Sequence, residues 1–171
     1  IMSYNYEITK DDYIDFNLYH MKNSSSNKIV FILLCYITPI LFAIPIYIIG
    51  TNVLKQPSYY WVIISLIFIA GWIFTYPKRY NRLIIRECTK SLKRNGSNNI
   101  LGQKNLTVAE ESIVIKGENS IDNIKLSEIK EIKLYKDLIL IYLDINTAHI
   151  ISTSSFTAEE KNALINMLGK K

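Results

Sequence analysis

The residues best suited to chemistry are basic, and they recur at helical spacing in the middle of the chain. Five of them follow one another at intervals of four, four, four and three residues. Because an α-helix has about 3.6 residues per turn, this spacing predicts one basic face. Each lysine or arginine near an anionic membrane surface contributes about 1 kcal/mol to binding. With one adjacent arginine, the expected lipid- or ligand-contacting face comprises Lys78, Arg79, Arg82, Arg86, Lys90 and Lys93.

Two interpretations of this basic face have equal weight. In the first, the helix lies on an anionic leaflet. In the second, the helix is solvated and its charges only set the orientation of a membrane span. Both interpretations require a helix over residues 78–95, and Gly96 is the residue type that commonly ends one.

Catalytic and metal-binding patterns are missing from the sequence. The two histidines, His20 and His149, stand alone, and no glycine-rich phosphate loop occurs. Glu110 and Glu111 suggest acid/base chemistry, but they fall at a predicted turn, where we expect them to be solvated. We therefore predict that the protein is not an enzyme and needs no metal or cofactor. Two further cations are retained as candidate ligand-binding residues, Lys130 and Lys133.

Two apolar stretches precede or overlap this basic segment. No charged residue occurs between Lys28 and Lys55, or between Lys55 and Lys78. About 20 apolar residues in a helix are long enough to cross a bilayer core of ~30 Å. We expect a transmembrane hairpin with spans at 29–49 and 59–76, a tight connection at 50–58, and an end to the second span at Pro77. Pro39 and Pro45 are expected to kink the first span.

The distribution of charge predicts the orientation of the hairpin. Residues 1–96 contain 11 Lys and Arg against five Asp and Glu, whereas residues 97–171 contain nine against ten. Both ends of the hairpin are flanked by basic residues, and its connection carries only Lys55. By the positive-inside rule, both termini are cytoplasmic. Because the basic surplus lies beside the spans, we expect anionic lipid headgroups rather than DNA or RNA as its partner.

Flanking segments predict a small α+β domain. Residues 4–8 alternate like a strand, and Thr9 with Asp12 predicts a capped helix to about residue 22, broken at 23–27. After Gly96 the hydrophobic period is two, which predicts antiparallel strands near 104–108, 112–116, 120–125, 129–135, 138–144 and 149–152. Thr157 and Glu160 predict a capped C-terminal helix. The expected domains are 1–28, 29–77, 78–96 (a basic juxtamembrane helix) and 97–171.

Several of these segments resemble the YcxB-like family of bacterial membrane proteins. The matching stretches are 9–13, 16–20, 106–108, 113–114, 127–132 and 138–143, together with the hairpin. The resemblance implies the bacterial cytoplasmic membrane and a C-terminal pleckstrin-homology-like domain, a bent β-sheet capped by one helix. That fold usually has seven strands, and residues 4–8 are the candidate for the seventh. The resemblance implies no reaction.

We therefore expect a non-enzymatic, membrane-anchored cytoplasmic module for interaction or regulation, whose partner is a protein or a second copy of the chain. Small two-helix proteins with a β-domain also resemble oligomeric membrane effectors of bacterial anti-phage signalling, controlled by a cyclic nucleotide or a partner. In that alternative, the basic helix is a lever jointed at Pro77. The nucleotide is held by Arg82, Arg86 and Lys90 of the basic face, or by Lys130 and Lys133. A second alternative is a membrane protein that gives immunity to a toxin.

Overall fold

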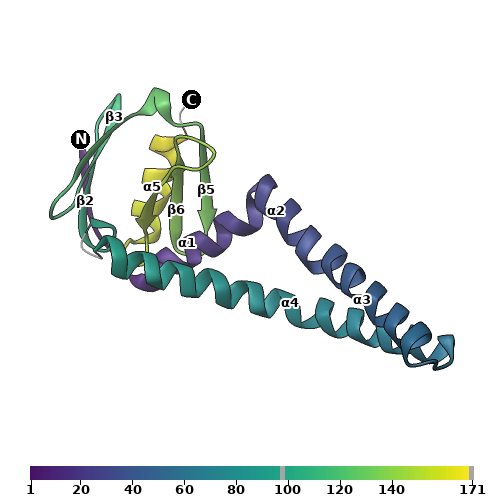
Figure 1. Ribbon diagram of the computed structural model, residues 1–171. Coiled ribbons are helices and arrows are strands. Elements are labelled where there is room, and N and C mark those ends of the chain that lie inside the picture. Colours follow the sequence, from purple (N-terminus) through teal and green to yellow (C-terminus); the bar gives the residue numbers. More distant parts are fainter. Residues whose placement is uncertain (97–98, 170–171) are drawn as a thin grey trace. The chain divides into compact units, whose positions relative to one another are not determined.

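The computed structural model describes residues 1–96 and 99–169, and it has the expected α+β organisation (Figure 1). Residues 97, 98, 170 and 171, which belong to the predicted 97–171 domain, lie outside the described residues. The chain divides into two compact units. The β-unit contains residues 1–19 and the chain from Glu87 onward, and the hairpin unit contains residues 20–86.

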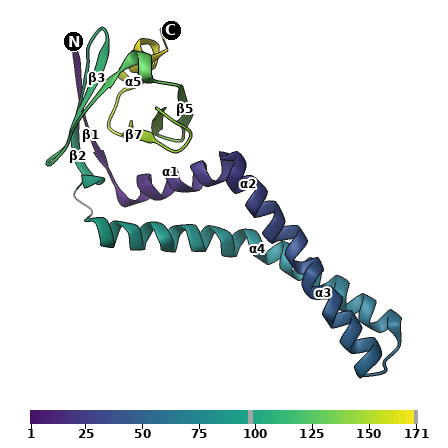
Figure 2. The same ribbon diagram turned by 45° about the horizontal axis from the view of Figure 1, so that its top comes forward.

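The β-unit contains two antiparallel sheets, which face each other in Figure 2. Within the described residues, the first sheet has four strands in sequential order and the second has three. The first comprises β1 (Met2–Ile8), β2 (Gly102–Val108), β3 (Ser112–Lys116) and β4 (Ile121–Lys125). The second comprises β5 (Glu131–Tyr135), β6 (Leu138–Tyr142) and β7 (Ala148–Ser152), and a short 3-10 helix over Leu126–Glu128 precedes it.

The predicted strands are confirmed, and the N-terminal strand joins the sheet. β1 pairs with β2 over its whole length, from Met2 opposite Val108 to Ile8 opposite Gly102. Alternate side chains of β1 point into the protein, because successive residues of a strand face opposite sides. Tyr4, Tyr6 and Ile8 are therefore buried, while the residues between them are exposed.

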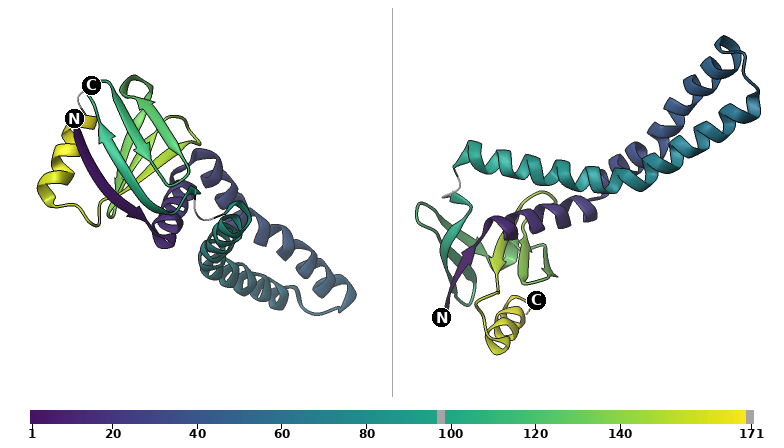
Figure 3. Two further views of the ribbon diagram at one scale, coloured as in Figure 1. Left: turned by 90° about the vertical axis from the view of Figure 1, so that its left-hand side faces the viewer. Right: turned by 90° about the horizontal axis from the view of Figure 1, so that it is seen from below.

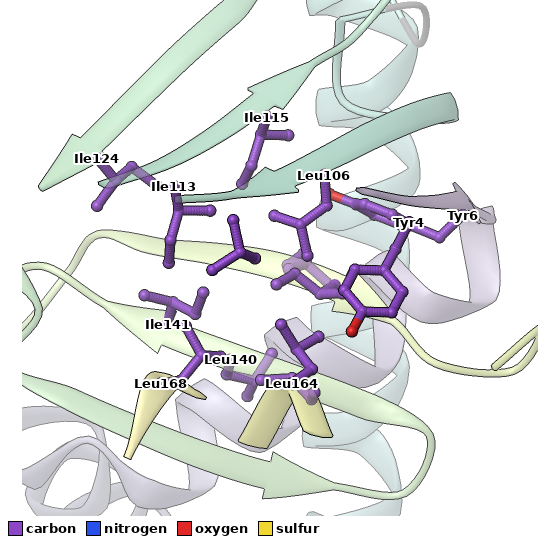
Figure 4. Packing of buried hydrophobic residues seen from close by; sticks show 14 of the residues in the cluster. Tyr4, Tyr6, Leu106, Ile113, Ile115, Ile124, Leu140, Ile141, Leu164 and Leu168 are labelled. Atoms are coloured by element: carbon purple, nitrogen blue, oxygen red, sulfur yellow. The ribbon is translucent and has the colours of Figure 1, made fainter. Parts of the chain in front are cut away.

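One hydrophobic core joins the two sheets and the C-terminal helix (Figure 4), and aromatic residues of the first helix pack against it. Helix α5 (Ala158–Leu168) contributes Leu164 and Leu168, and Thr157 and Glu160 form the predicted capping box at its start. Helix α1 (Lys10–Asn23) begins with a similar reciprocal cap. The Thr9 amide donates to the Asp12 carboxylate at 3.0 Å, and the Asp12 amide donates to the Thr9 hydroxyl at 3.2 Å. Its aromatic residues Tyr13, Phe16 and Tyr19 pack against the core.

The first apolar segment is helical from Ser25 to Val53, with two π-helical turns. It comprises α2 (Ser25–Ile32), η1 (Leu33–Ile37), α3 (Thr38–Ile48) and η2 (Ile49–Val53). The predicted break at 23–27 is too long, because α1 reaches Asn23 and α2 already begins at Ser25. Proline removes a helical donor and its ring crowds the carbonyl four residues earlier. In a regular α-helix the Pro39 ring would crowd the Cys35 carbonyl, and Cys35 lies within the π-turn η1.

The second apolar segment belongs to a helix longer than predicted. Helix α4 runs without interruption from Ser58 to Asn95, and Pro77 lies inside it. The span predicted to residue 76 and the helix predicted at 78–95 are therefore parts of one continuous helix, in which Pro77 is not a break. One proline costs a helix one hydrogen bond, and a long apolar helix can retain its course despite that loss. Gly96, with φ of 73°, follows the last helical residue, as expected of a terminating glycine.

The hairpin unit brings the two apolar segments side by side (Figure 3). The Trp72 indole donates a hydrogen bond to the Leu34 carbonyl oxygen at 3.1 Å. Near the connection, Gly50 lies so close to the Trp61 ring that a Cβ atom at position 50 would overlap it. The connection is shorter than predicted, since residues up to Val53 are helical. Within the described residues, Ser25–Val53 and Ser58–Asn95 are the helical segments long and apolar enough to cross a membrane.

Candidate functional site

The predicted basic face lies on the surface of α4. All six predicted residues are exposed, whereas Ile84, Cys88 and Leu92, spaced four residues apart, are buried. Residues four apart lie on one side of a helix, and Arg82 and Arg86 fall about half a turn away from this buried line. The local sequence therefore gives α4 an apolar side and a basic side, on which Lys78, Arg82, Arg86, Lys90 and Lys93 are exposed.

Two members of the basic face already have partners within the chain. The Arg79 guanidinium lies 4.6 Å from the centre of the Trp72 ring, and its Nη2 donates to the Thr75 hydroxyl at 3.2 Å. Lys90 Nζ lies 3.2 Å from Glu87 Oε1. The second pair is exposed to solvent, so it contributes little to stability and leaves the lysine available. Arg79, by contrast, is held along the helix by an aromatic ring and a hydroxyl.

A pocket of about 350 Å³ lies at the base of the hairpin unit. Lys22 and Lys28 supply its positive charge, and Phe31, Ile32 and Pro77 supply apolar wall. Phe31 is fixed there by aromatic contacts, because its ring centre lies 5.6 Å from that of Tyr76 and 5.0 Å from that of Tyr80. The pocket combines two cations with an apolar wall, which is the chemistry that an anionic amphiphile requires.

The two candidate ligand-binding lysines, Lys130 and Lys133, differ in how readily they could bind an anion. Lys130 is exposed. Lys133 is half-buried, with Nζ 3.5 Å from Glu131 Oε1 and 5.8 Å from the centre of the Tyr142 ring. An added anion would have to compete with the Glu131 carboxylate for Lys133. The structure therefore leaves Lys130 exposed and gives Lys133 an existing anionic neighbour.

The acidic pair does not form a buried acid/base site. Glu110 and Glu111 are exposed at the turn between β2 and β3, beside an open pocket of about 590 Å³ that Ser112, Asn123 and Lys125 also line. Among residues 1–96 and 99–169, no group of three or more His, Cys, Asp and Glu side chains gathers in a way that could hold a metal ion.

Sequence reasoning did not select Phe31 or Tyr80 at the hairpin pocket, or Tyr6 and Lys104 in the β-unit. The spacing of aromatic residues along α4 is a signal for Tyr80, since Trp72, Tyr76 and Tyr80 recur every four residues. No local signal pairs Tyr6 with Lys104. Their contact depends on the register between strands that lie far apart in the chain.

Comparison with known proteins supports one relationship. Residues 108–168 match the family described as YcxB-like protein, which covers the segment from the last residue of β2 to the end of α5. The predicted resemblance is confirmed for this part of the chain. Neither the curated proteins nor the solved structures contain a match.

Proposed function

This chain is YcxB-like over residues 108–168, and from this premise we propose that it is a non-enzymatic interaction module anchored in the bacterial cytoplasmic membrane. The observation that carries the proposal is the apolar surface of the hairpin unit. Large side chains such as Leu41, Phe42, Leu66, Ile67 and Phe74 are more than half exposed. Such a surface is costly in water, but it is the surface that a helix presents to lipid tails.

The charges at the base of the hairpin support an anionic leaflet as the surface that the module contacts. Lys22 and Lys28 line the 350 Å³ pocket beside Phe31 and Ile32. A phospholipid matches this pocket, with its phosphate near the two lysines and its acyl chain along the apolar wall. The exposed lysines and arginines of α4 add positive charge that an anionic leaflet would neutralise. Within this proposal, the β-unit is the part that binds a protein partner or a second copy.

Cysteine accessibility tests the anchor and its orientation. The full chain is expressed in bacteria with Cys35 and Cys88 replaced by alanine, and a single cysteine is placed at Lys55 or Lys116. We expect a membrane-impermeant maleimide to label Lys55→Cys in intact cells and Lys116→Cys only after lysis. Lys116 is a matched control because it is an exposed lysine of the β-unit. Release of the chain by alkaline carbonate, or labelling of Lys116→Cys from outside, would contradict the proposal.

Partner binding is tested on the full chain in native membranes. Two copies with different affinity tags are co-expressed, crosslinked before solubilisation, and purified through one tag. We expect recovery of the second copy or of a reproducible partner protein. Recovery of neither, at expression levels where the membrane location has been verified, would contradict an interaction role while leaving the anchor intact.

A further inference from the structure

A small polar pocket lies within the β-unit, apart from the basic face. Its volume is about 130 Å³, and its polar lining includes Tyr6 from β1, Lys104 from β2 and His149 from β7. Isoleucines 8, 115 and 150 form much of the remaining wall. Liquid water occupies roughly 30 Å³ per molecule, so the pocket has room for about four waters or one small polyatomic ion.

Tyr6 supplies a hydroxyl without a partner. Its side chain belongs to the core drawn in Figure 4, and the residue is only 2% exposed. The hydroxyl is fully buried and makes no hydrogen bond within the described structure. Burial, reinforced by the Asp122 carboxylate, raises the pKa of this phenol, so it remains a neutral donor at physiological pH. Buried hydroxyls are normally paired. Tyr6 is one of the residues in the wall of the pocket, and its hydroxyl oxygen has almost no accessible surface there.

Lys104 and His149 place two more donors at the same pocket. Lys104 is the cross-strand partner of Tyr6, and its Nζ donates to the Asn99 carbonyl oxygen at 3.4 Å. Burial lowers the pKa of Lys104, although Asp122 opposes that effect. His149 Nδ1 lies 4.0 Å from Asp122 Oδ2. Burial also lowers the pKa of His149, with Asp122 acting in the opposite direction and Lys104 in the same direction.

The lining defines the chemical class of the ligand. A hydroxyl, an ammonium and an imidazole can all donate hydrogen bonds. The Asp122 carboxylate does not line the pocket, but its charge acts on all three residues, so a bound anion would compete with it. Hydrogen bonds from charged donors to oxyanions are among the stronger ones in proteins. We propose that this pocket binds a small oxyanion, a phosphate or carboxylate group, held by the Lys104 ammonium and the His149 imidazole and, once the wall gives way at Tyr6, by the Tyr6 hydroxyl.

A bound oxyanion would also affect the protonation of His149. An anion in the pocket would favour the imidazolium, and Asp122, whose Oδ2 lies 4.0 Å from His149 Nδ1, would stabilise the same charged form. The charged and titratable groups that face His149 are Asp122 from β4 and Lys104 from β2, with the Tyr6 phenol from β1 across the pocket. This inference uses only residues of the β-unit, so it is independent of the membrane anchor.

The test uses the full chain in detergent, with sulfate and acetate as probes. Sulfate stands for a phosphate group and keeps its charge across neutral pH, and acetate stands for a carboxylate. Binding is measured by titration calorimetry and by the melting temperature, with sodium chloride at equal ionic strength as the reference. We expect a saturable rise in melting temperature with one of the two probes. Sulfate alone would identify a phosphate site, and acetate alone a carboxylate site.

Variants at the donors separate binding from folding. Lys104→Met should weaken probe binding about tenfold or more, because a charged hydrogen bond is lost. The matched control Lys116→Met removes an exposed lysine from β3 and should leave binding unchanged. Tyr6→Phe should raise the melting temperature without probe, since the unpaired hydroxyl is gone, and should reduce the rise that the probe produces. Tyr4→Phe removes a hydroxyl from the same strand that already contacts the Met2 sulfur, and should do neither.

The pH dependence of binding gives a further readout. Sulfate should bind more tightly at about pH 5.5 than at about pH 7.5, and His149→Gln should remove that difference. A melting temperature that rises no more with either probe than with chloride would overturn the proposal. So would an equal response of the Lys104 and Lys116 variants, because the effect would then be a general effect of salt.

Discussion

Tyr6 and Lys104 lie directly opposite each other in the antiparallel pair of β1 and β2, although both apolar helices separate them along the chain. The pair joins strand β1, which precedes the hairpin in the chain, to strand β2, which follows it. The β-unit therefore depends on a segment that the chain synthesises before either apolar helix. A substitution in β1 should therefore destabilise the core around Leu106 and Leu164, and its effect should not be confined to the N-terminus.

Replacing Ile8 by alanine tests this dependence. Ile8 is 4% exposed, and truncating a buried isoleucine typically costs about 2–5 kcal/mol. We expect a loss in that range in the free energy of unfolding of the full chain in detergent. Glu7→Ala changes the exposed neighbour in the same strand and should stay within about 0.5 kcal/mol of the parent.

Hydrogen exchange gives an independent measure of the same dependence. The β1 amides that bond to β2 should exchange slowly in the parent protein, together with those of the central strands. Fast exchange throughout residues 2–8 in a folded protein, or equal stability of the Ile8 and Glu7 variants, would show that β1 is not an integral strand.

Gly50→Ala should disturb the packing of the hairpin. The added Cβ would overlap the Trp61 ring, and overpacking of this kind typically costs about 1–3 kcal/mol. Gly71→Ala is the matched control, because a Cβ there meets nothing within 4 Å and alanine is favoured over glycine inside a helix by about 0.5–1 kcal/mol. The detergent-solubilised chain is unfolded with SDS and followed by tryptophan fluorescence. Equal midpoints for the two variants would contradict the close Gly50–Trp61 contact.

Local patterns in the sequence were sufficient for most elements. Alternation in segments such as 112–116 predicts a strand because one face must be buried, and the Thr157 cap predicts the start of α5. The uninterrupted course of α4 through Pro77 was not predictable from the local rule that proline stops helices. That rule describes the loss of one backbone hydrogen bond. Whether the helix continues depends on its other hydrogen bonds and on its surroundings.

The basic face was predictable because helical spacing alone places its residues together. The 130 Å³ pocket was not, because its donors come from three strands and only their pairing brings them together. His149 shows the difference most clearly. Its position in an alternating segment predicts a strand, but nothing near it in sequence indicates Asp122 or Lys104 as neighbours.

The stability of the β-unit should depend on pH through His149. Burial lowers the pKa of His149 in the folded chain from its usual value of 6.5, so the unfolded chain binds the proton first as the pH falls. The contribution of this residue to stability is therefore fully present above pH 6.5 and is lost as the pH falls from 6.5 towards the lower folded pKa. His149→Gln should reduce this loss.

This dependence is measured by denaturant unfolding across acidic pH in a chloride buffer without oxyanions. Added sulfate should diminish the loss, because an anion beside the imidazolium opposes the effect of burial. Identical pH profiles for the parent and His149→Gln would contradict a half-buried, neutral His149.

Anionic lipid should shield the lysines of the basic face from chemical modification. The full chain is placed in nanodiscs with or without an anionic phospholipid, and acetylation of each lysine by a water-soluble reagent is followed by mass spectrometry. We expect slower acetylation of Lys90 and Lys93 in anionic discs. Lys116 and Lys125, which are exposed in the β-unit, serve as internal controls for reagent activity. High salt should remove the shielding, because the Debye length falls from about 10 Å at 0.1 M to about 3 Å at 1 M.

Reversing two charges separates lipid contact from a solvated helix. Arg82→Glu with Arg86→Glu removes two contacts worth about 1 kcal/mol each, so shielding of Lys90 and Lys93 should weaken by about tenfold or more. Lys116→Glu with Lys125→Glu changes the net charge by the same amount outside α4 and should leave the shielding intact. If the α4 lysines react equally fast in both kinds of disc, the basic face is solvated. Its charges would then serve only to orient the hairpin.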